Sequence, residues 1–254
     1  MSGHSKWSSI KHKKGAADAK RGQLFTKLIK EITAAAKSGG GDPEANPRLR
    51  LAIARAKEGN MPKDNIERAI KRGTGELPGV IYEEVLYEGY APGGVAVLVE
   101  ALTDNKNRTT AEVRNIFSRN GGNLAGAGSV AWIFQKKGYI LVEKSRVEEE
   151  KLMEIVLGAG AEDLHAEESA YEITTLPKDL EAVKQALQQA GISSQSAELT
   201  MLPTSTVPVN DEATAKKILA FMDALEEHED ISHAYANFDI PDAILASASG
   251  SPLL

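Results

Sequence analysis

Thr74-Gly75-Glu76-Leu77-Pro78-Gly79 separates two parts of the sequence whose patterns favour different folds. Two glycines and a proline within this stretch are typical of a linker, because both residue types interrupt regular helices and strands. Before the linker, apolar residues recur at the three- and four-residue spacing of amphipathic helices. After it come two strand-like runs, Glu84 to Tyr90 and Val95 to Leu102, separated by the turn signal Pro92-Gly93-Gly94. We therefore expect a domain boundary at residue 78.

The part before the linker predicts three helices. The first begins near Asp18 and ends at Ser38-Gly39-Gly40-Gly41, because glycine supplies the backbone angles of a helix stop. Asn46-Pro47 is typical of an N-cap followed by a proline in the first turn of a second helix. Pro62 opens a third helix, and Gly73 closes it. Three helices in this short stretch predict a small bundle.

The part after the linker mixes strands and helices. Its first two strands are followed by a helix from about Thr109 to Arg119, a glycine-rich loop from Gly121 to Gly128 and a strand from Val130 to Phe134. Residues 138–202 then run strand, helix, strand, strand, helix, strand, which is the βαββαβ order of a ferredoxin-like domain. A helix through Ile218 and Met222 and a strand from Ser232 to Phe238 resemble the missing half of the earlier sheet.

These patterns together predict an α+β protein of three domains. An N-terminal three-helix domain precedes two ferredoxin-like α/β domains, one of which is inserted in the other. The predicted domains are residues 1–78 (helical), 79–136 plus 205–240 (discontinuous α/β) and 137–204 (inserted βαββαβ). We expect residues 241–254 to form a disordered tail, because their small and polar residues have little to bury.

Composition excludes several classes of protein. No apolar run approaches the roughly 20 residues that a membrane helix needs, so we expect no membrane partner. Without cysteine, the chain has no disulfides, thiolate chemistry or cysteine-type metal sites. Five histidines leave little for a His-rich metal site. The first thirty residues are basic and rich in serine, as organellar presequences are, but arginine is scarce and no clean cleavage region follows. We therefore expect a cytoplasmic protein.

The charge of the chain is divided unevenly. Residues 1–78 hold 17 Lys and Arg against 8 Asp and Glu, a net charge of +9, whereas residues 79–254 hold 13 against 28, a net charge of −15. This pattern favours a basic module that meets nucleic acid, joined to an acidic body. Docking of two oppositely charged domains on each other is the alternative. The acidic body would repel phosphate, which confines binding to one end of the molecule.

The N-terminal arm and the basic helix faces are the predicted nucleic-acid-binding site. Lysines such as Lys11, Lys13 and Lys14 supply point charges for phosphates, and Trp7 among them could stack on an unpaired base. Alternatively, Trp7 packs against the first helix and the lysines only solvate the end of the chain. The candidate residues are His4, Lys6, Trp7, Lys11, His12, Lys13, Lys14, Lys20, Arg21, Lys27, Arg48, Arg50, Arg55, Lys63, Arg68, Lys71 and Arg72.

Signals of enzymatic chemistry are weak. The phosphate-binding motif G-x-x-x-x-G-K-[ST] is absent, and Gly73-Thr74-Gly75 does not extend to G-x-G-x-x-G. The loop Gly121–Gly128 could cradle phosphate, but it precedes a strand rather than a helix. Asp104-Asn105-Lys106-Asn107-Arg108 could carry a metal-binding acid of a nuclease, yet a polar turn that starts the next helix explains it better. We expect no enzyme activity, catalytic residue, metal or cofactor. A scaffold that binds only proteins is a further alternative.

Several strings closely resemble the YebC/PmpR family. They are Met1-Ser2-Gly3-His4-Ser5-Lys6-Trp7, Ile10-Lys11-His12-Lys13-Lys14, Phe25-Thr26-Lys27-Leu28, Asn46-Pro47-Arg48-Leu49-Arg50, Asn60-Met61-Pro62, Arg72-Gly73-Thr74-Gly75, Tyr87-Glu88-Gly89-Tyr90, Leu102-Thr103-Asp104-Asn105-Lys106-Asn107-Arg108-Thr109 and Gly121-Gly122-Asn123-Leu124. The resemblance covers about residues 1–240. Departures are small: Ser2 and Ala91 replace alanine and glycine, and Lys13, Lys30 and Lys106 replace arginine, which keeps the charge but loses bidentate geometry.

The resemblance implies a three-domain fold and a non-enzymatic role in gene expression. The family is usually described as DNA-binding transcriptional regulators. Some members, including mitochondrial relatives, resemble translation factors that act on ribosomes at proline-rich stretches. We therefore expect a nucleic-acid partner, DNA or ribosomal RNA, with the ribosome as the alternative partner, and no small-molecule substrate.

Overall fold

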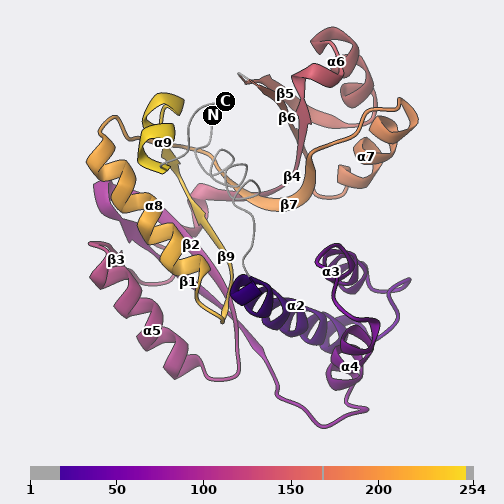
Figure 1. Cartoon of the computed structure of the whole chain (residues 1–254), viewed down its shortest axis with the longest axis vertical. Coiled ribbons are helices and arrows are strands. Elements are labelled where there is room, and N and C mark those ends of the chain that lie inside the picture. Colours follow the sequence, from indigo (N-terminus) through magenta and orange to yellow (C-terminus); the bar gives the residue numbers. More distant parts are fainter. Residues whose placement is uncertain (1–17, 168, 250–254) are drawn as a thin grey trace. The chain divides into compact units, whose positions relative to one another are not determined.

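The computed structural model describes residues 18–167 and 169–249, and Figure 1 labels its helices and strands. The chain divides into two compact units. One unit is the continuous stretch Ile133–Thr204, and the other joins the chain up to Trp132 with the chain from Ser205 onward.

Three helices form the N-terminal part of the first unit. They are α2 (Asp18–Gly39), α3 (Pro47–Glu58) and α4 (Lys63–Thr74). Their apolar stripes meet in one core that includes Ile32, Leu49, Ala52, Ala56 and Ala69, all of them buried. Figure 1 shows α3 and α4 beside the long helix α2. The predicted small bundle of three helices is confirmed.

Local residues fix the ends of these helices. The predicted N-cap is confirmed, because the Asn46 side chain accepts a hydrogen bond from the backbone N–H of Leu49 at 3.1 Å. The Asn46 amide also donates to the carbonyl of Ala35, which ties α3 to the end of α2. The predicted stop at Gly73 is wrong. The α4 helix ends at Thr74 and is capped by Gly75 at φ +82°.

Gly73 instead lets α4 approach α2 closely. A Cβ atom added at Gly73 would lie 2.5 Å from the carbonyl oxygen of Thr33 and 2.7 Å from the Cβ of Ala36. Such contacts are too short for any side chain, so only glycine permits this packing. The sequence marked the correct residue, but its role is helix packing rather than helix termination.

A four-stranded antiparallel sheet forms the rest of the first unit. Its elements are β1 (Glu83–Ala91), β2 (Val95–Thr103), α5 (Lys106–Arg119), β3 (Asn123–Leu124), α8 (Glu212–Glu226) and β9 (Ile231–Ala236). The strand order is β3-β1-β2-β9, so β9 pairs with β2 although about 130 residues separate them. The expectation that the C-terminal elements complete the earlier sheet is confirmed.

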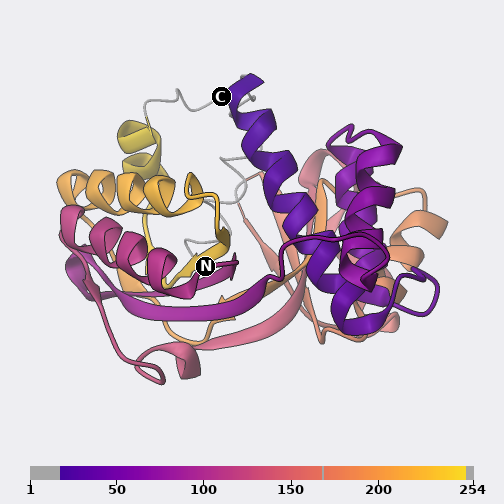
Figure 2. The same cartoon turned by 90° about the horizontal axis from the view of Figure 1, so that it is seen from below.

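Both helices α5 and α8 cover the same face of this sheet (Figure 2). Alternate residues of β2, Val95, Val97 and Val99, point into the core beneath them, as the two-residue period of a strand requires. Phe117 of α5 meets Phe221 of α8 edge to face, with ring centroids 4.9 Å apart.

The second unit is the inserted α/β domain. Its elements are β4 (Phe134–Glu143), α6 (Glu149–Gly158), β5 (Ala161–Ala166), β6 (Ala170–Thr175), α7 (Leu180–Gln189) and β7 (Ser196–Pro203). The order β5-β6-β4-β7, with every neighbouring pair antiparallel, is ferredoxin-like. Its core of Ile140, Ile173, Leu152 and Val183 lies between the sheet and the two helices.

Both sheets share one plan. In the inserted domain, β6 lies between the strands of the unit β4-α6-β5; in the first sheet, β1 lies between the strands of the unit β2-α5-β3. The outer strands β7 and β9 complete the two sheets in corresponding places. The predicted class is confirmed: an α+β protein with a three-helix domain followed by two ferredoxin-like domains, one inserted in the other. The predicted boundaries at residues 78, 136 and 204 stay predictions.

The predicted strand over residues 130–134 is also wrong. Instead of a strand over Val130–Phe134, the chain forms a 3-10 turn at Ala131–Ile133, and β4 begins only at Phe134. The reason is that the backbone N–H groups of Val130 and Ala131 donate to the Glu88 carboxylate, which keeps them out of a strand ladder.

The predicted disordered tail is wrong for residues 242–249, which form α9 (Asp242–Ser249). Leu245 is buried, and Ile244 and Ala248 pack against the same core, so this short segment does have an apolar face to bury. Residues 250–254 lie outside the described residues. Two short parallel strands, β8 (Val207–Pro208) and β10 (Phe238–Asp239), precede α9.

None of the described helices is long and apolar enough to span a lipid bilayer.

Candidate nucleic-acid interface

The predicted basic residues fall into three groups. His4, Lys6, Trp7, Lys11, His12, Lys13 and Lys14 lie outside the described residues. Lys20 and Arg21 belong to the start of α2, and their side chains are outside the description too. The structure places the other eight on the three-helix domain: Lys27, Arg48, Arg50, Arg55, Lys63, Arg68, Lys71 and Arg72.

Helix α4 carries an exposed basic face formed by Arg68, Lys71 and Arg72, called the α4 basic face below. The opposite side of α4 is apolar, because Ile66 and Ala69 are buried against α2. Among the described residues, no acidic side chain pairs with any of the three cations. The α4 basic face therefore offers three uncompensated positive charges to an external anion.

Other predicted bases already have partners in the chain. The Arg48 guanidinium bonds to both Glu31 and Glu84. Burial opposes the charged form of Arg48, but these two carboxylates outweigh it and raise the pKa of Arg48 above its ordinary value. The ammonium of Lys27 donates to the carbonyl oxygen of Glu226 at 2.5 Å. These residues hold parts of the fold together.

Each of the remaining three bases has a contact within the chain. Lys63 lies 3.4 Å from Glu67 in an exposed ion pair one turn along α4. Arg50 donates to the carbonyl oxygens of Pro43 and Glu44 at 3.3 and 3.4 Å. Arg55 is half-buried on α3 and has an interaction partner.

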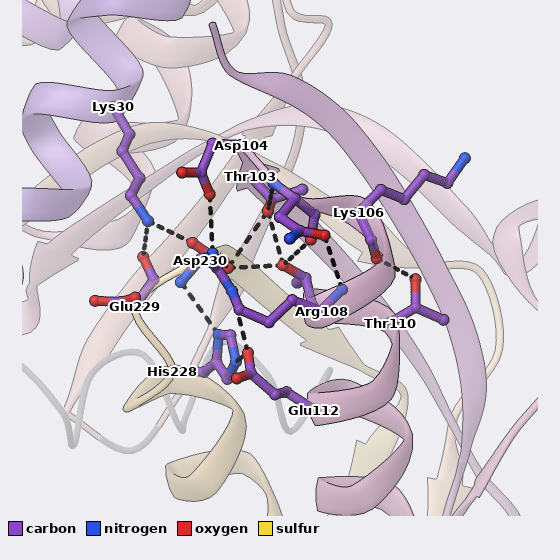
Figure 3. A network of polar contacts seen from close by, with 12 residues as sticks. Lys30, Thr103, Asp104, Lys106, Arg108, Thr110, Glu112, His228, Glu229 and Asp230 are labelled. Carbon is purple, nitrogen blue, oxygen red and sulfur yellow. Dashed lines mark hydrogen bonds and ion pairs between the residues drawn. The ribbon is translucent and has the colours of Figure 1, made fainter. Parts of the chain in front are cut away.

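Sequence reasoning missed a buried ionic network centred on Asp230, just before β9 (Figure 3). The Asp230 side chain is 0% exposed. Its Oδ1 accepts from the Lys30 ammonium at 2.5 Å, and its Oδ2 accepts from Arg108 at 2.8 Å and from the Thr109 hydroxyl at 2.7 Å. Burial alone would raise the pKa of Asp230, but these donors overcome it and hold that pKa well below its usual range.

This network explains the polar stretch that follows β2. Asn105 caps α5 by accepting from the backbone N–H of Arg108 at 3.1 Å, which confirms the predicted turn that starts a helix. The Thr103 and Thr109 hydroxyls lie 2.7 Å apart and border the Asp230 carboxylate. Asp104 pairs with Arg108 at 2.9 Å. These residues position cations around Asp230 and thereby join α2 to the sheet.

Within the described residues, Glu112, His228 and Asp230 are close enough together to be considered as metal ligands. The surrounding bonds oppose that use. Lys30 and Arg108 already form ion pairs with the Asp230 carboxylate, and a metal ion would have to compete with both cations. His228 Nδ1 accepts from the backbone N–H of Asp230, so His228 Nε2 carries the proton and donates it to Glu112 at 2.9 Å. The group is better suited to a hydrogen-bonded support than to a metal centre.

Backbone N–H groups in and just after the glycine-rich loop already bind a carboxylate of the same chain. The carboxylate of Glu88 on β1 is 4% exposed and accepts from the backbone N–H groups of Gly128, Val130 and Ala131 at 2.6 to 2.7 Å. Burial works against ionisation, but these hydrogen bonds lower the pKa of Glu88. Donors that could have cradled a phosphate already hold an anion of the chain itself.

Comparisons with known proteins agree with this architecture. A family model described as the TACO1/YebC protein N-terminal domain matches residues 5–76, and one described as the TACO1/YebC second and third domain matches residues 82–238. A crystal structure of a conserved hypothetical protein from Aquifex aeolicus is similar with a TM-score of 0.78 and 53% identity, covering 89% of this chain and 93% of that one.

Relatives of known name are similar over nearly the whole chain. A protein of Desulfosudis oleivorans named "Probable transcriptional regulatory protein" is 60% identical over 244 residues, 96% of this chain and 99% of the relative. A protein of the same name from Persephonella marina is 57% identical over 250 residues, 98% of this chain and all of the relative. With both family models matched and identity at this level, the chain belongs to the TACO1/YebC family.

Proposed function

We propose that this protein is a non-enzymatic, nucleic-acid-binding regulator of gene expression in the cytoplasm, acting on DNA as a transcriptional regulator. The observation that carries the proposal is the α4 basic face, Arg68, Lys71 and Arg72, whose charges no acid of the described chain compensates. The name that the relatives share, probable transcriptional regulatory protein, supports regulation as the role.

The charge of the three domains supports binding at one end of the chain. Residues 1–78 have a net charge of +9, whereas the remaining residues have a net charge of −15. Phosphates are attracted by the first part and repelled by the second, so the helical domain and the arm that precedes it form the contact surface. Release of counterions from the nucleic acid would then supply much of the affinity.

Fluorescence anisotropy with labelled duplex DNA at rising salt tests this proposal. The triple variant Lys11→Glu, Lys13→Glu, Lys14→Glu should bind more weakly and with a shallower salt dependence. The log–log slope should fall by about 0.9 for each phosphate that the variant no longer neutralises. A matched control reverses three other lysines, Lys136, Lys151 and Lys178, which are exposed on the acidic inserted domain. Equal weakening in both variants would mean that only net charge matters, and would refute a located site.

A second measurement examines the choice of nucleic acid. Ribosome co-sedimentation in DNase-treated lysate, with the wild type and the Lys11, Lys13, Lys14 variant, should leave the wild-type protein unbound at physiological salt. A preference among DNA sequences in the anisotropy assay should accompany that result. Travel of the wild type, but not the variant, with ribosomal particles would replace the transcriptional role with one in translation.

A further inference from the structure

A pocket of about 230 Å³ lies beside the α4 basic face. Helix α2 supplies Ile29 and Thr33, and α4 supplies Arg72. The extended segment 78–82, which leads into β1, closes the other side with Pro78, Val80 and Tyr82. All of these residues belong to the first compact unit, and none of the lining side chains is acidic.

The end of α4 builds this pocket. Gly73 brings α4 against α2, and Arg72 lines the pocket together with Ile29 and Thr33 of α2. Gly75 then takes the left-handed conformation, and the backbone N–H of Leu77 donates to the carbonyl of Lys71 at 3.0 Å. This reversal sends residues 78–82 back along the helices. The stem of Arg72 packs over Gly79, where an added Cβ would lie 3.0 Å from the Arg72 Cγ.

Its walls combine apolar surface with unused polar groups. Ile29, Pro78 and Val80 provide apolar contacts. The Tyr82 ring also lines the pocket, and the Lys30 ammonium lies 5.8 Å from the centroid of that ring. In the part of the chain that the structure describes, the backbone groups of Gly79 and Val80 make no hydrogen bonds. An occupant with a flat apolar ring and polar edges would satisfy both kinds of surface.

We propose that this pocket binds one unpaired nucleotide, with its base between segment 78–82 and α2 and its phosphate on Arg72. The proposal rests on the proposed function and specifies which form of nucleic acid the site takes. The free guanidinium of Arg72 and the neighbouring Lys71 and Arg68 give the entrance the positive charge that a phosphate requires. The pocket is too small for a base pair, which favours a base that has left its stack.

Affinity for matched probes tests the proposal in the full-length protein. The probes are a short single strand, the same strand with abasic sites in place of its bases, and the corresponding duplex, each prepared as DNA and as RNA. The wild type should bind the intact single strand about tenfold more tightly than the abasic strand, as expected when a base is stacked. Comparing the DNA strand with the RNA strand identifies which nucleotide the pocket accepts.

Three variants test whether the preference for the intact strand arises in the pocket. Arg72→Ala removes part of the pocket wall as well as a phosphate contact, so it should weaken binding of both strands, the intact strand more, and reduce the difference between them. Arg68→Ala, a matched arginine on the same helix outside the pocket lining, should weaken both strands equally. Val80 lines the pocket and is 50% exposed, so the larger side chain of Val80→Phe can fill the pocket without a change in charge. This variant should lose the preference for the intact strand. Unchanged thermal melting would establish that the variants are folded.

The outcomes separate this proposal from the proposed function. Equal wild-type affinity for intact and abasic strands, or an identical response of Arg72→Ala and Arg68→Ala, would overturn the nucleotide pocket and leave electrostatic binding standing. Tight duplex binding that is insensitive to Val80→Phe would do the same. Absence of binding to every probe would overturn both proposals.

Discussion

Two sets of basic residues in this protein differ in their partners. Lys30 and Arg108 converge on a fully buried aspartate, and their charges are compensated within the chain. Arg68, Lys71 and Arg72 stand exposed on α4, and none of the acids described by the structure compensates them. A net charge summed over residues 1–78 counts Lys30 and Arg72 equally. An interface is therefore recognised by which charges lack a partner, rather than by how many charges there are.

The difference has an energetic basis. A charge removed from water loses its hydration. Lys30 is tolerated because Asp230 lies 2.5 Å from its ammonium and the carbonyl oxygen of Glu229 accepts a further hydrogen bond at 3.1 Å. An exposed cation such as Arg68 keeps its hydration and contributes little to the stability of the fold. We therefore expect substitutions in the first set to change stability, and substitutions in the second set to change binding.

The largest expected effect is that of Asp230→Asn. Loss of this charge leaves the Lys30 ammonium, 9% exposed, without its counterion, and breaking a buried pair in this way costs about 3–5 kcal/mol. Urea denaturation at neutral pH measures the loss. Glu227→Gln, an exposed acid in the same connection between α8 and β9, is the control and should stay within about 0.5 kcal/mol of the wild type. Equal stability of the two variants would refute the role given to the network.

The stabilisation by Asp230 should also depend on pH. Its pKa is lowered in the folded state, so its contribution is complete above the unfolded-state pKa of about 3.9 and is lost as the pH falls toward the folded-state value. The difference in unfolding free energy between the wild type and Asp230→Asn should therefore be constant at neutral pH and shrink below about pH 4. A difference that grew on acidification would contradict this assignment.

A substitution at Glu88 tests whether backbone N–H groups, without a cation, can stabilise a buried carboxylate. Its carboxylate is held by backbone N–H groups alone among the hydrogen bonds described, and Glu88→Ala leaves the donors of Gly128, Val130 and Ala131 unpaired. We expect a loss of about 1–3 kcal/mol, smaller than that of Asp230→Asn. Hydrogen exchange should locate the change at these three amides. Unaltered protection of the amides would show that Glu88 does not order the loop.

Charge reversal on the α4 basic face should weaken binding and leave the stability of the fold nearly unchanged. In Arg68→Glu, Lys71→Glu, we expect affinity for nucleic acid to fall about tenfold, or about 1.4 kcal/mol, with little change in stability. Anisotropy titrations and thermal melts on the same samples measure both quantities. A variant that unfolds more easily yet binds as before would reverse the division drawn between the two sets.

The smallest expected effect is that of Lys63→Ala. Lys63 and Glu67 form an exposed pair at 3.4 Å along α4, and such pairs contribute less than about 0.5 kcal/mol. Urea denaturation at low and high salt should give nearly the same small difference. A loss comparable to that of Asp230→Asn would mean that an exposed ion pair stabilises the fold as much as a buried one.

The sequence predicted the elements of the fold better than the contacts between them. Asn46-Pro47 was predicted as a helix start and is one, because an N-cap bond reaches only three residues along the chain. At Gly73 the sequence predicted a helix stop, whereas the reason for glycine is α2, some forty residues earlier. The exposed α4 bases followed from helical periodicity. Asp230 and Glu88 carried no local signal, since their partners are distant in sequence.

Periodicity, capping residues and charge distribution are local properties, and from them the sequence alone determined the three-helix domain, the βαββαβ order, the discontinuous sheet and the basic character of residues 1–78. Which of those bases have acidic partners depends instead on the tertiary structure. Lys27 and Lys30 meet acceptors about two hundred residues away, at the end of α8 and in the connection between α8 and β9. Whether a charge is buried beside a partner depends on how distant segments pack, and no pattern within a single segment contains that information.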